Sequence, residues 1–202
     1  MYLQIQEIIP EKIWEYKNNF PKSYLHNLQN KPFFCESVFA RGIISEYIWN
    51  GYLSQEDENW APIFHDSNFW SLSHKTGCVF VWVSDSEIGV DIEYLLEKSH
   101  ELISLFPQKM YDMCGGKNWK NFYTLWTSFE AIQKMRRWKD ISWEEFTLLS
   151  FELIKADISE IPFQTRTLYE RKGKNYQVFT GFLENKVYSV CTSQNIDYEI
   201  MT

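Results

Sequence analysis

The stretch Trp70–Glu93 constrains the fold of this chain more than any other part of the sequence. Two runs of β-branched and aromatic residues, Cys78–Ser84 and Ile88–Glu93, flank three polar residues, a pattern typical of a β-hairpin. The polar segment W-S-L-S-H-K-T-G before the first run predicts a loop that carries Ser73 and His74. We therefore expect an antiparallel hairpin at the centre of the fold.

The second of these strands carries two carboxylates, Asp91 and Glu93, two residues apart. Side chains alternate across a strand, so both carboxylates leave one face while Val90 and Ile92 point to the other. Two neighbouring anions repel each other unless a positive charge lies between them, and Mg²⁺ is a cation that prefers oxygen ligands. The alternative is that both carboxylates face water at the end of a hairpin.

Length and charge set the broad class of the protein. The chain has 202 residues and a net charge of −7, which suits one or two small domains with a buried core. Aromatic residues make up 18% of the sequence, and this content excludes a disordered chain. No nucleic-acid partner is expected, because such binding depends on basic surface.

The cysteines and the N-terminus bear on the compartment. None of the four cysteines is paired as C-x-x-C or has a histidine at zinc-ligand spacing. The N-terminus has no basic region followed by an apolar run, and no apolar run reaches membrane length. We expect no signal peptide, no membrane partner, and a reducing, cytoplasmic location.

The rest of the chain alternates between helical and strand patterns. Helices are expected from Pro10 to Pro21, over Phe34–Leu53, within Lys98–Leu105 and over Trp119–Trp138, with a further turn between Pro107 and Gly115-Gly116. Strands are expected over Tyr2–Ile8, Gln164–Glu170, Tyr176–Leu183 and Val187–Thr192, and residues 54–69 are expected to form a loop. Each half of the chain thus combines helices with a small antiparallel sheet, and Asp91–Glu93 lies at their junction, a favoured place for a ligand cleft.

The predicted helix Trp119–Trp138 places Trp126, Glu130 and Lys134 on one ridge. Glu130 and Lys134 can form an ordinary helix pair, which contributes about 0.2–0.5 kcal/mol. They can also present a carboxylate and an ammonium together at a metal–phosphate site. Arg41 within the first long helix and Lys31 just before it can be plain surface charges.

Three motifs together resemble a known family. S-L-S-H at Ser71–His74, G-V-D-I-E at Gly89–Glu93 and L-W-T-S-F-E-A-I-Q-K at Leu125–Lys134 are similar to the serine–histidine loop, the metal-binding signature and the W-x-x-K-E-x-x-x-K helix of the 4′-phosphopantetheinyl transferases of the Sfp type. Their order and separation fit that family from about Phe33 to the C-terminus.

The resemblance implies an α+β fold of two pseudo-symmetric lobes, each a small antiparallel sheet packed with helices, with a ligand cleft between them. The N-terminal lobe would cover residues 1–87 and the C-terminal lobe residues 88–202. The implied enzyme is a monomer of the holo-[acyl-carrier-protein] synthase type. It moves the phosphopantetheine arm of coenzyme A onto a serine of an acyl or peptidyl carrier protein and releases 3′,5′-ADP. Mg²⁺ is the implied metal, with Mn²⁺ as a second candidate, and coenzyme A is the co-substrate.

The resemblance also assigns roles to individual residues. The implied metal ligands are Asp91, Glu93 and Glu130. The implied catalytic residues are Glu130, Lys134, Asp91 and His74. The residues implied to contact coenzyme A are Lys31, Arg41, Ser73, His74 and Lys134.

This chain departs from the family pattern at several positions. Phe129 stands where the family has a lysine, and Met110 stands where it often has a glutamate. The usual G-K-P before the serine–histidine segment is absent, the basic residues before the first long helix are reduced to Lys31, and Arg136-Arg137-Trp138-Lys139 replaces a glycine-lysine-glycine. The metal carboxylates and Lys134 are present, so an active but diverged enzyme is expected.

Two alternatives remain. The first is a diverged, weakly active or inactive member that only binds coenzyme A or a carrier protein, which the substitutions at Phe129 and Met110 favour. The second is a metal-dependent phosphodiesterase, because D-x-E on a strand with E-x-x-x-K on a helix also suits that chemistry. The net charge of −7 disfavours the second, because a nuclease needs a basic track for its substrate.

Overall fold

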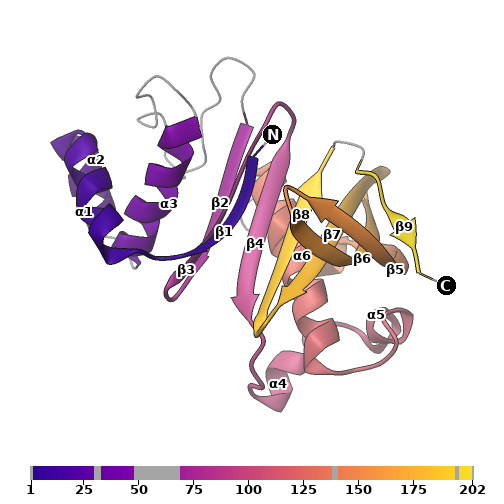
Figure 1. Ribbon diagram of the computed structural model, residues 1–202. Coiled ribbons are helices and arrows are strands. Elements are labelled where there is room, and N and C mark those ends of the chain that lie inside the picture. The colour runs from indigo at the N-terminus through magenta and orange to yellow at the C-terminus, as the bar shows by residue number, and fades with distance from the viewer. Residues whose placement is uncertain (1, 30–32, 48–68, 138–140, 194–195, 202) are drawn as a thin grey trace.

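Two antiparallel sheets and six α-helices make up the part of the chain that the structure describes, residues 2–29, 33–47, 69–137, 141–193 and 196–201 (Figure 1). The structure is a computed structural model, and its α+β class confirms the class predicted from the sequence. The strands are β1 (Tyr2–Glu7), β2 (Phe69–Lys75), β3 (Cys78–Ser84), β4 (Ile88–Tyr94), β5 (Thr147–Ile158), β6 (Ile161–Arg171), β7 (Lys174–Leu183), β8 (Lys186–Thr192) and β9 (Glu199–Ile200). The helices are α1 (Pro10–Asn19), α2 (Lys22–Gln29), α3 (Phe34–Tyr47), α4 (His100–Ile103), α5 (Gln108–Met113) and α6 (Trp119–Arg136), with a short 3-10 turn, η1 (Trp143–Glu145).

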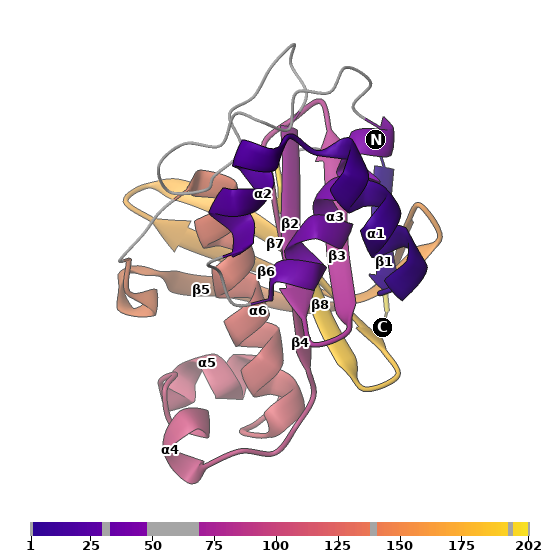
Figure 2. The same cartoon turned by 90° about the vertical axis from the view of Figure 1, so that its left-hand side faces the viewer.

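The first sheet has the strand order β1-β3-β2. All seven residues of β3 are buried, because both of its faces are covered. Val79, Val81 and Val83 belong to a core shared with α1, α2 and α3, and Figure 2 shows these helices lying over this sheet. Phe80 and Trp82 point the other way, into a core shared with the second sheet. This burial explains why β3 reads as a continuous apolar run.

The second sheet has the order β4-β8-β7-β6-β5-β9, with α6 packed mainly on β4 and β8. Asn118 caps the helix, since its Oδ1 accepts a hydrogen bond from the backbone N–H of Asn121 at 2.9 Å. Gly89 of β4 lies directly beneath α6. A Cβ atom there would lie 2.0 Å from the carbonyl oxygen of Ala131 and 2.4 Å from the backbone nitrogen of Met135. The glycine therefore sets how closely the strand and the helix approach.

Strands β3 and β4 do not form the predicted hairpin. Strand β3 pairs with β1 and β2, whereas β4 pairs with β8 in the other sheet. Both edges of β3 are already occupied, so the chain crosses from one sheet to the other over residues 85–87. The turn was predicted at the correct residues, but the pairing was wrong because local sequence does not specify which edge a strand will meet.

The segment predicted as a loop with Ser73 and His74 is strand β2. Trp70 and Leu72 contribute to the core beneath α3, while the hydroxyl groups of Ser71 and Ser73 accept hydrogen bonds from the backbone N–H groups of β4 at 3.0 and 3.4 Å. The serines made the segment look polar. They are buried because they join the edges of the two sheets.

Other expectations are confirmed or corrected in detail. The strands Tyr2–Ile8, Gln164–Glu170, Tyr176–Leu183 and Val187–Thr192 are present with ends shifted by a few residues, as are the helices at Pro10, Phe34, Lys98 and Trp119. Helix α2 was missed because Pro21 was interpreted only as the end of the first helix. In the structure Pro21 also precedes a second helix, and its carbonyl oxygen accepts a hydrogen bond from the backbone N–H of Leu25. Strand β5 was missed because two register shifts interrupt its alternation. Expectations for residues 48–68 and for Trp138 lie outside the described residues.

Two sequence-based expectations concern membranes and cysteine pairing. Among the described residues, no helix is both long and apolar enough to cross a membrane. All four cysteines are free thiols, three of them buried. A location in the cytoplasm stays a prediction.

Replacing Gly89 by alanine is expected to lower the free energy of unfolding by about 2–3 kcal/mol, because the added methyl group overlaps the backbone of α6. Urea unfolding with a common m-value measures this loss. Gly173→Ala is the matched control. It meets open space but has φ +76°, which costs about 1 kcal/mol. Equal losses in the two variants would show that close packing at Gly89 is unimportant.

Candidate functional site

Asp91, Ser73 and Lys134 form a triangle of hydrogen bonds at the meeting point of β2, β4 and α6. The Lys134 Nζ atom lies 2.6 Å from Asp91 Oδ1 and 2.9 Å from Ser73 Oγ. The Ser73 hydroxyl donates to the same Asp91 oxygen at 2.8 Å. Lys134 is 61 residues from Ser73 and 43 from Asp91 along the chain. The fold thus brings the three sequence motifs to one place.

A second pair lies beside this triangle. Lys75 Nζ donates to Glu93 Oε1 at 2.7 Å, and this pair has the same sequence separation of 18 residues as Ser73–Asp91. The equal separation shows that β2 and β4 run side by side in the same direction. Alternation along β2 therefore presents Ser71, Ser73 and Lys75 to β4.

Asp91 is buried, with 5% of its surface exposed. Its Oδ1 atom has two donors, but its Oδ2 atom is buried and has no hydrogen-bond partner among the described residues. A buried carboxylate oxygen without a partner is costly. This atom is the strongest single indication that the site receives a further positive or hydrogen-donating group.

Glu130 lies close enough to the strand carboxylates to sense their charge. Burial raises the pKa of Glu130, the negative charge of Asp91 raises it further, and Glu93 adds a smaller effect. The positive charge of Lys134 opposes these effects in part. The three predicted metal ligands therefore interact electrostatically, and a cation among them would relieve their repulsion.

His74 points away from the triangle, toward α3. Its Nε2 atom lies 3.4 Å from Ser37 Oγ, and its ring lies 5.4 Å from that of Phe33. Its buried Nδ1 atom has no hydrogen-bond partner in the described part of the chain. Burial, followed by the positive charge of Lys134, lowers the pKa of His74 to about 4, with Glu36 opposing and Arg41 adding to the decrease. His74 is therefore neutral at pH 7.

Arg41 is buried on α3, where its Nη1 atom donates to the carbonyl oxygen of Ser37 at 3.3 Å. Its positive charge contributes to the lowered pKa of His74, so the two side chains interact electrostatically. Lys31, the other basic residue predicted to contact coenzyme A, lies outside the described residues.

Phe129 and Met110, at which the chain departs from the family pattern, belong to the hydrophobic core. Phe129 is buried in the core beneath α6, and its ring meets that of Phe146 edge to face at 5.6 Å. Met110 of α5 is buried in the same core. Both side chains are thus surrounded by apolar groups, and a lysine at position 129 would place its charge among them.

Sequence reasoning missed Lys75, Ser71 and Ser37 as members of the site. Lys75 and Ser71 follow from the period-2 pattern of β2 once this segment is recognised as a strand. Ser37 lies one helical turn before Arg41 on α3, so the helix places both near His74. No local feature of the sequence indicates that α3 lies over β2.

The arrangement suits chemistry on a charged substrate. Lysines now neutralise Asp91 and Glu93, and no group of three or more His, Cys, Asp or Glu side chains in the described part of the chain is arranged to hold a metal ion.

No protein-family model matches this chain, and no curated protein matches it.

We expect His74 to titrate with a pKa of about 4 and Lys134→Met to raise that pKa, because the variant removes a neighbouring positive charge. The C–H resonances of His74 followed by NMR against pH measure both values. The ordinary histidine pKa is about 6.5, so the unfolded chain binds a proton between pH 6.5 and 4 that the folded chain does not bind. Stability should fall as the pH is lowered through this range.

Two variants make this test specific. His74→Asn should reduce the acid sensitivity of unfolding because it removes the titrating group. Lys174→Met, which removes an exposed lysine from the start of β7, should leave the pKa of His74 unchanged. An unshifted His74 pKa in Lys134→Met would contradict the assigned electrostatic contact.

Proposed function

We propose that this protein is a 4′-phosphopantetheinyl transferase that moves the phosphopantetheine arm of coenzyme A onto a serine of an acyl or peptidyl carrier protein. The observation that carries the proposal is the meeting of Ser73, Asp91 and Lys134. These residues come from the three motifs that resemble the family. Their convergence in space is what a shared site requires.

The proposed lobes are residues 1–87 and 88–202. This division is supported by the sheets, because β1, β2 and β3 belong to one sheet and β4–β9 to the other. Each sheet also has its own helices, α1–α3 for the first and α4–α6 for the second (Figure 1). We propose that coenzyme A lies in a cleft between these lobes, next to the edges where β2 and β4 meet.

Asp91, Glu93 and Glu130 would hold the divalent cation, Mg²⁺ or Mn²⁺. All three are carboxylates, whose oxygen atoms such an ion prefers, and Asp91 Oδ2 has no hydrogen-bond partner among the described residues. The three are not arranged around a cation here, so binding would require them to move closer together. When bound, the cation would neutralise charge on the pyrophosphate oxygens. The contacts that Lys134 and Lys75 now make with Asp91 and Glu93 would be replaced, leaving both ammonium groups available to the phosphates.

Glu130 and Lys134 are the proposed reacting side chains of the helix. In the transfer, a new bond forms between the carrier serine oxygen and the β-phosphorus of coenzyme A, and the pyrophosphate bond breaks to release 3′,5′-ADP. Glu130, or a metal-bound water, would accept the proton of the serine hydroxyl. Lys134 would stabilise negative charge on the phosphate oxygens.

Ser73 acts as a positioning residue in this proposal. Its hydroxyl donates to Asp91 and accepts from both Lys134 and the N–H of Ile92. It therefore holds the carboxylate and the ammonium together before substrate enters. His74 and Arg41 lie on the α3 side of β2, where they would contact phosphate groups of coenzyme A, His74 as a neutral hydrogen-bond donor and Arg41 as a charge.

The burial of Phe129 favours a second candidate function. Because this position belongs to the core, the chain has no lysine beside Glu130 to assist proton transfer or phosphate binding. A protein with the same site but little or no transfer would bind coenzyme A or a carrier protein without modifying it. Both candidates would bind coenzyme A or a carrier protein, but only the transferase would form a modified carrier protein.

Intact mass spectrometry of apo carrier proteins incubated with this protein, coenzyme A and Mg²⁺ tests the proposal. We expect a mass gain of one phosphopantetheine that disappears with a chelator. Asp91→Asn should reduce the rate by about two orders of magnitude or more, because it removes one charge from the electrostatic centre of the site. Glu152→Gln is the control, because Glu152 pairs with Arg166 on β5 and β6, away from the triangle.

The outcomes separate the candidates. Full activity in Asp91→Asn would overturn the metal assignment. No mass gain on any carrier, with coenzyme A still binding by calorimetry, would favour the binding protein. Circular dichroism and urea unfolding of both variants check that the fold is retained.

A further inference from the structure

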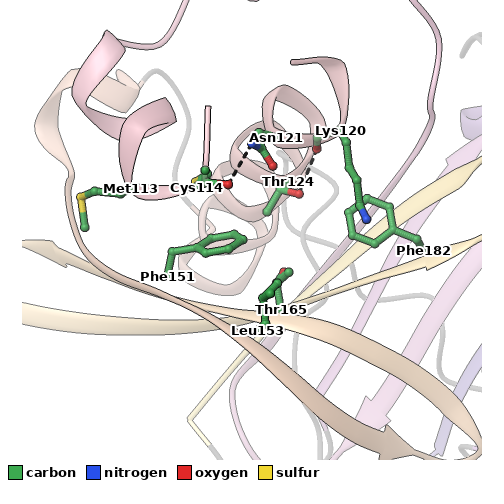
Figure 3. A pocket seen from close by; sticks show the side chains of 10 residues that line it. Met113, Cys114, Lys120, Asn121, Thr124, Phe151, Leu153, Thr165 and Phe182 are labelled. Atoms are coloured by element: carbon green, nitrogen blue, oxygen red, sulfur yellow. Dashed lines mark hydrogen bonds between the residues drawn. The ribbon is translucent and has the colours of Figure 1, made fainter. Parts of the chain in front are cut away.

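A pocket of about 340 Å³ lies between the N-terminal half of α6 and the face of β5, β6 and β7 (Figure 3). It forms where α6, which packs mainly on β4 and β8, leaves the neighbouring strands uncovered. Phe151 and Leu153 of β5, Thr165 of β6 and Phe182 of β7 form its strand side. Its volume is at the lower end of the range for small-molecule sites.

This pocket is distinct from the Asp91 site. It shares no lining residue with the triangle or with the Lys75–Glu93 pair. Lys120, its residue nearest the start of α6, precedes Glu130 by ten positions, which corresponds to about 15 Å along a helix axis. The inference about this pocket does not depend on the proposed transferase function.

Lys120 supplies the only charge among the described residues that line the pocket. Its Nζ atom lies 4.4 Å from the centre of the Phe182 ring, and Figure 3 shows the side chain extending along the pocket to that ring. Within the described part of the chain, it has no carboxylate within salt-bridge distance. The ammonium is thus held at an aromatic wall with its charge available to an anion.

Thr165 supplies a second polar group. Only 4% of its surface is exposed, and its Oγ1 atom has no hydrogen-bond partner among the described residues. In Figure 3 the side chain points from β6 toward α6, into the space beside Phe182. A buried hydroxyl without a partner is unfavourable unless a bound group satisfies it.

The other polar side chains of the pocket are already used as donors. Asn121 Nδ2 donates to the carbonyl oxygen of Cys114 at 2.9 Å, and Thr124 Oγ1 donates to that of Lys120 at 3.0 Å. Lys120 and Thr165 are therefore the donors left for a ligand. The remaining walls are apolar and include Phe151, Leu153 and Met113.

We propose that this pocket binds a small amphipathic monocarboxylate. Its carboxylate accepts hydrogen bonds from Lys120 and Thr165 beside the Phe182 ring. Its apolar body packs on Phe151 and Leu153. Positive charge, an unused hydroxyl and apolar walls in one pocket match this chemical class and disfavour cations and fully polar ligands.

Titration of the full chain, labelled with ¹⁵N, with octanoate tests the proposal, with octanamide and octylammonium as neutral and cationic comparators. We expect saturable octanoate binding that shifts the backbone amides of Phe151, Thr165 and Phe182. Octanamide should bind about tenfold more weakly because it lacks the charge. Equal affinity for the two, tighter octylammonium binding or no saturable octanoate binding would each overturn the proposal.

Variants assign the binding to the two donors. Lys120→Met should weaken octanoate binding about tenfold while leaving octanamide binding unchanged, because it keeps the apolar stem over Phe182. Thr165→Val should weaken octanoate binding without lowering thermal stability, because the hydroxyl it removes has no partner among the described residues. Lys174→Met is the matched control and should bind octanoate like the parent protein. Unchanged octanoate affinity in Lys120→Met would overturn the assignment.

Discussion

The charge of Asp91 is the constraint on which the centre of this molecule depends. A carboxylate buried between two sheets and a helix is stable only if cations and donors balance it, because burial removes the stabilisation that water supplies. Lys134 from α6 and Ser73 from β2 provide that balance at 2.6 and 2.8 Å. Asp91 Oδ1 therefore connects β4 to both α6 and β2. Asp91 Oδ2 has no hydrogen-bond partner among the described residues, so this site can accept another group.

Lys134 reaches Asp91 because α6 packs closely on β4, and Gly89, two residues before Asp91, allows this close packing. Gly89 faces the helix backbone, so α6 can lie directly on β4. Since side chains alternate along a strand, Gly89, Asp91 and Glu93 share the face toward α6, while Val90 and Ile92 enter the core with β1 and β3. The absence of a side chain at Gly89 therefore allows Asp91 and Glu93, the next two side chains on that face, to meet partners from α6 and from β2.

The motifs predicted much of this site because their chemistry is local. The spacing of Asp91 and Glu93 placed both on one strand face, and the spacing of Glu130 and Lys134 placed both on one helix ridge. The serine–histidine segment was misread because a strand whose alternate residues are serines resembles a loop in composition. That error hid Lys75, which is a partner of Glu93 only because β2 is extended. Phe129 was visible as a departure from the family, but its place in the core depends on Phe146 and Tyr176, which follow it by many residues.

Local sequence patterns are sufficient to specify the class of structure, most strands and helices, and the faces from which the charged side chains leave. These properties follow from periodicity and from short-range sterics, which depend on neighbouring residues. The tertiary structure alone decided that β3 and β4 belong to different sheets, that β2 runs beside β4, and that a pocket with Lys120 and Thr165 opens where α6 leaves the sheet. Strand pairing and helix placement arise from the competition of all apolar surfaces for burial, and that competition involves residues far apart in the chain.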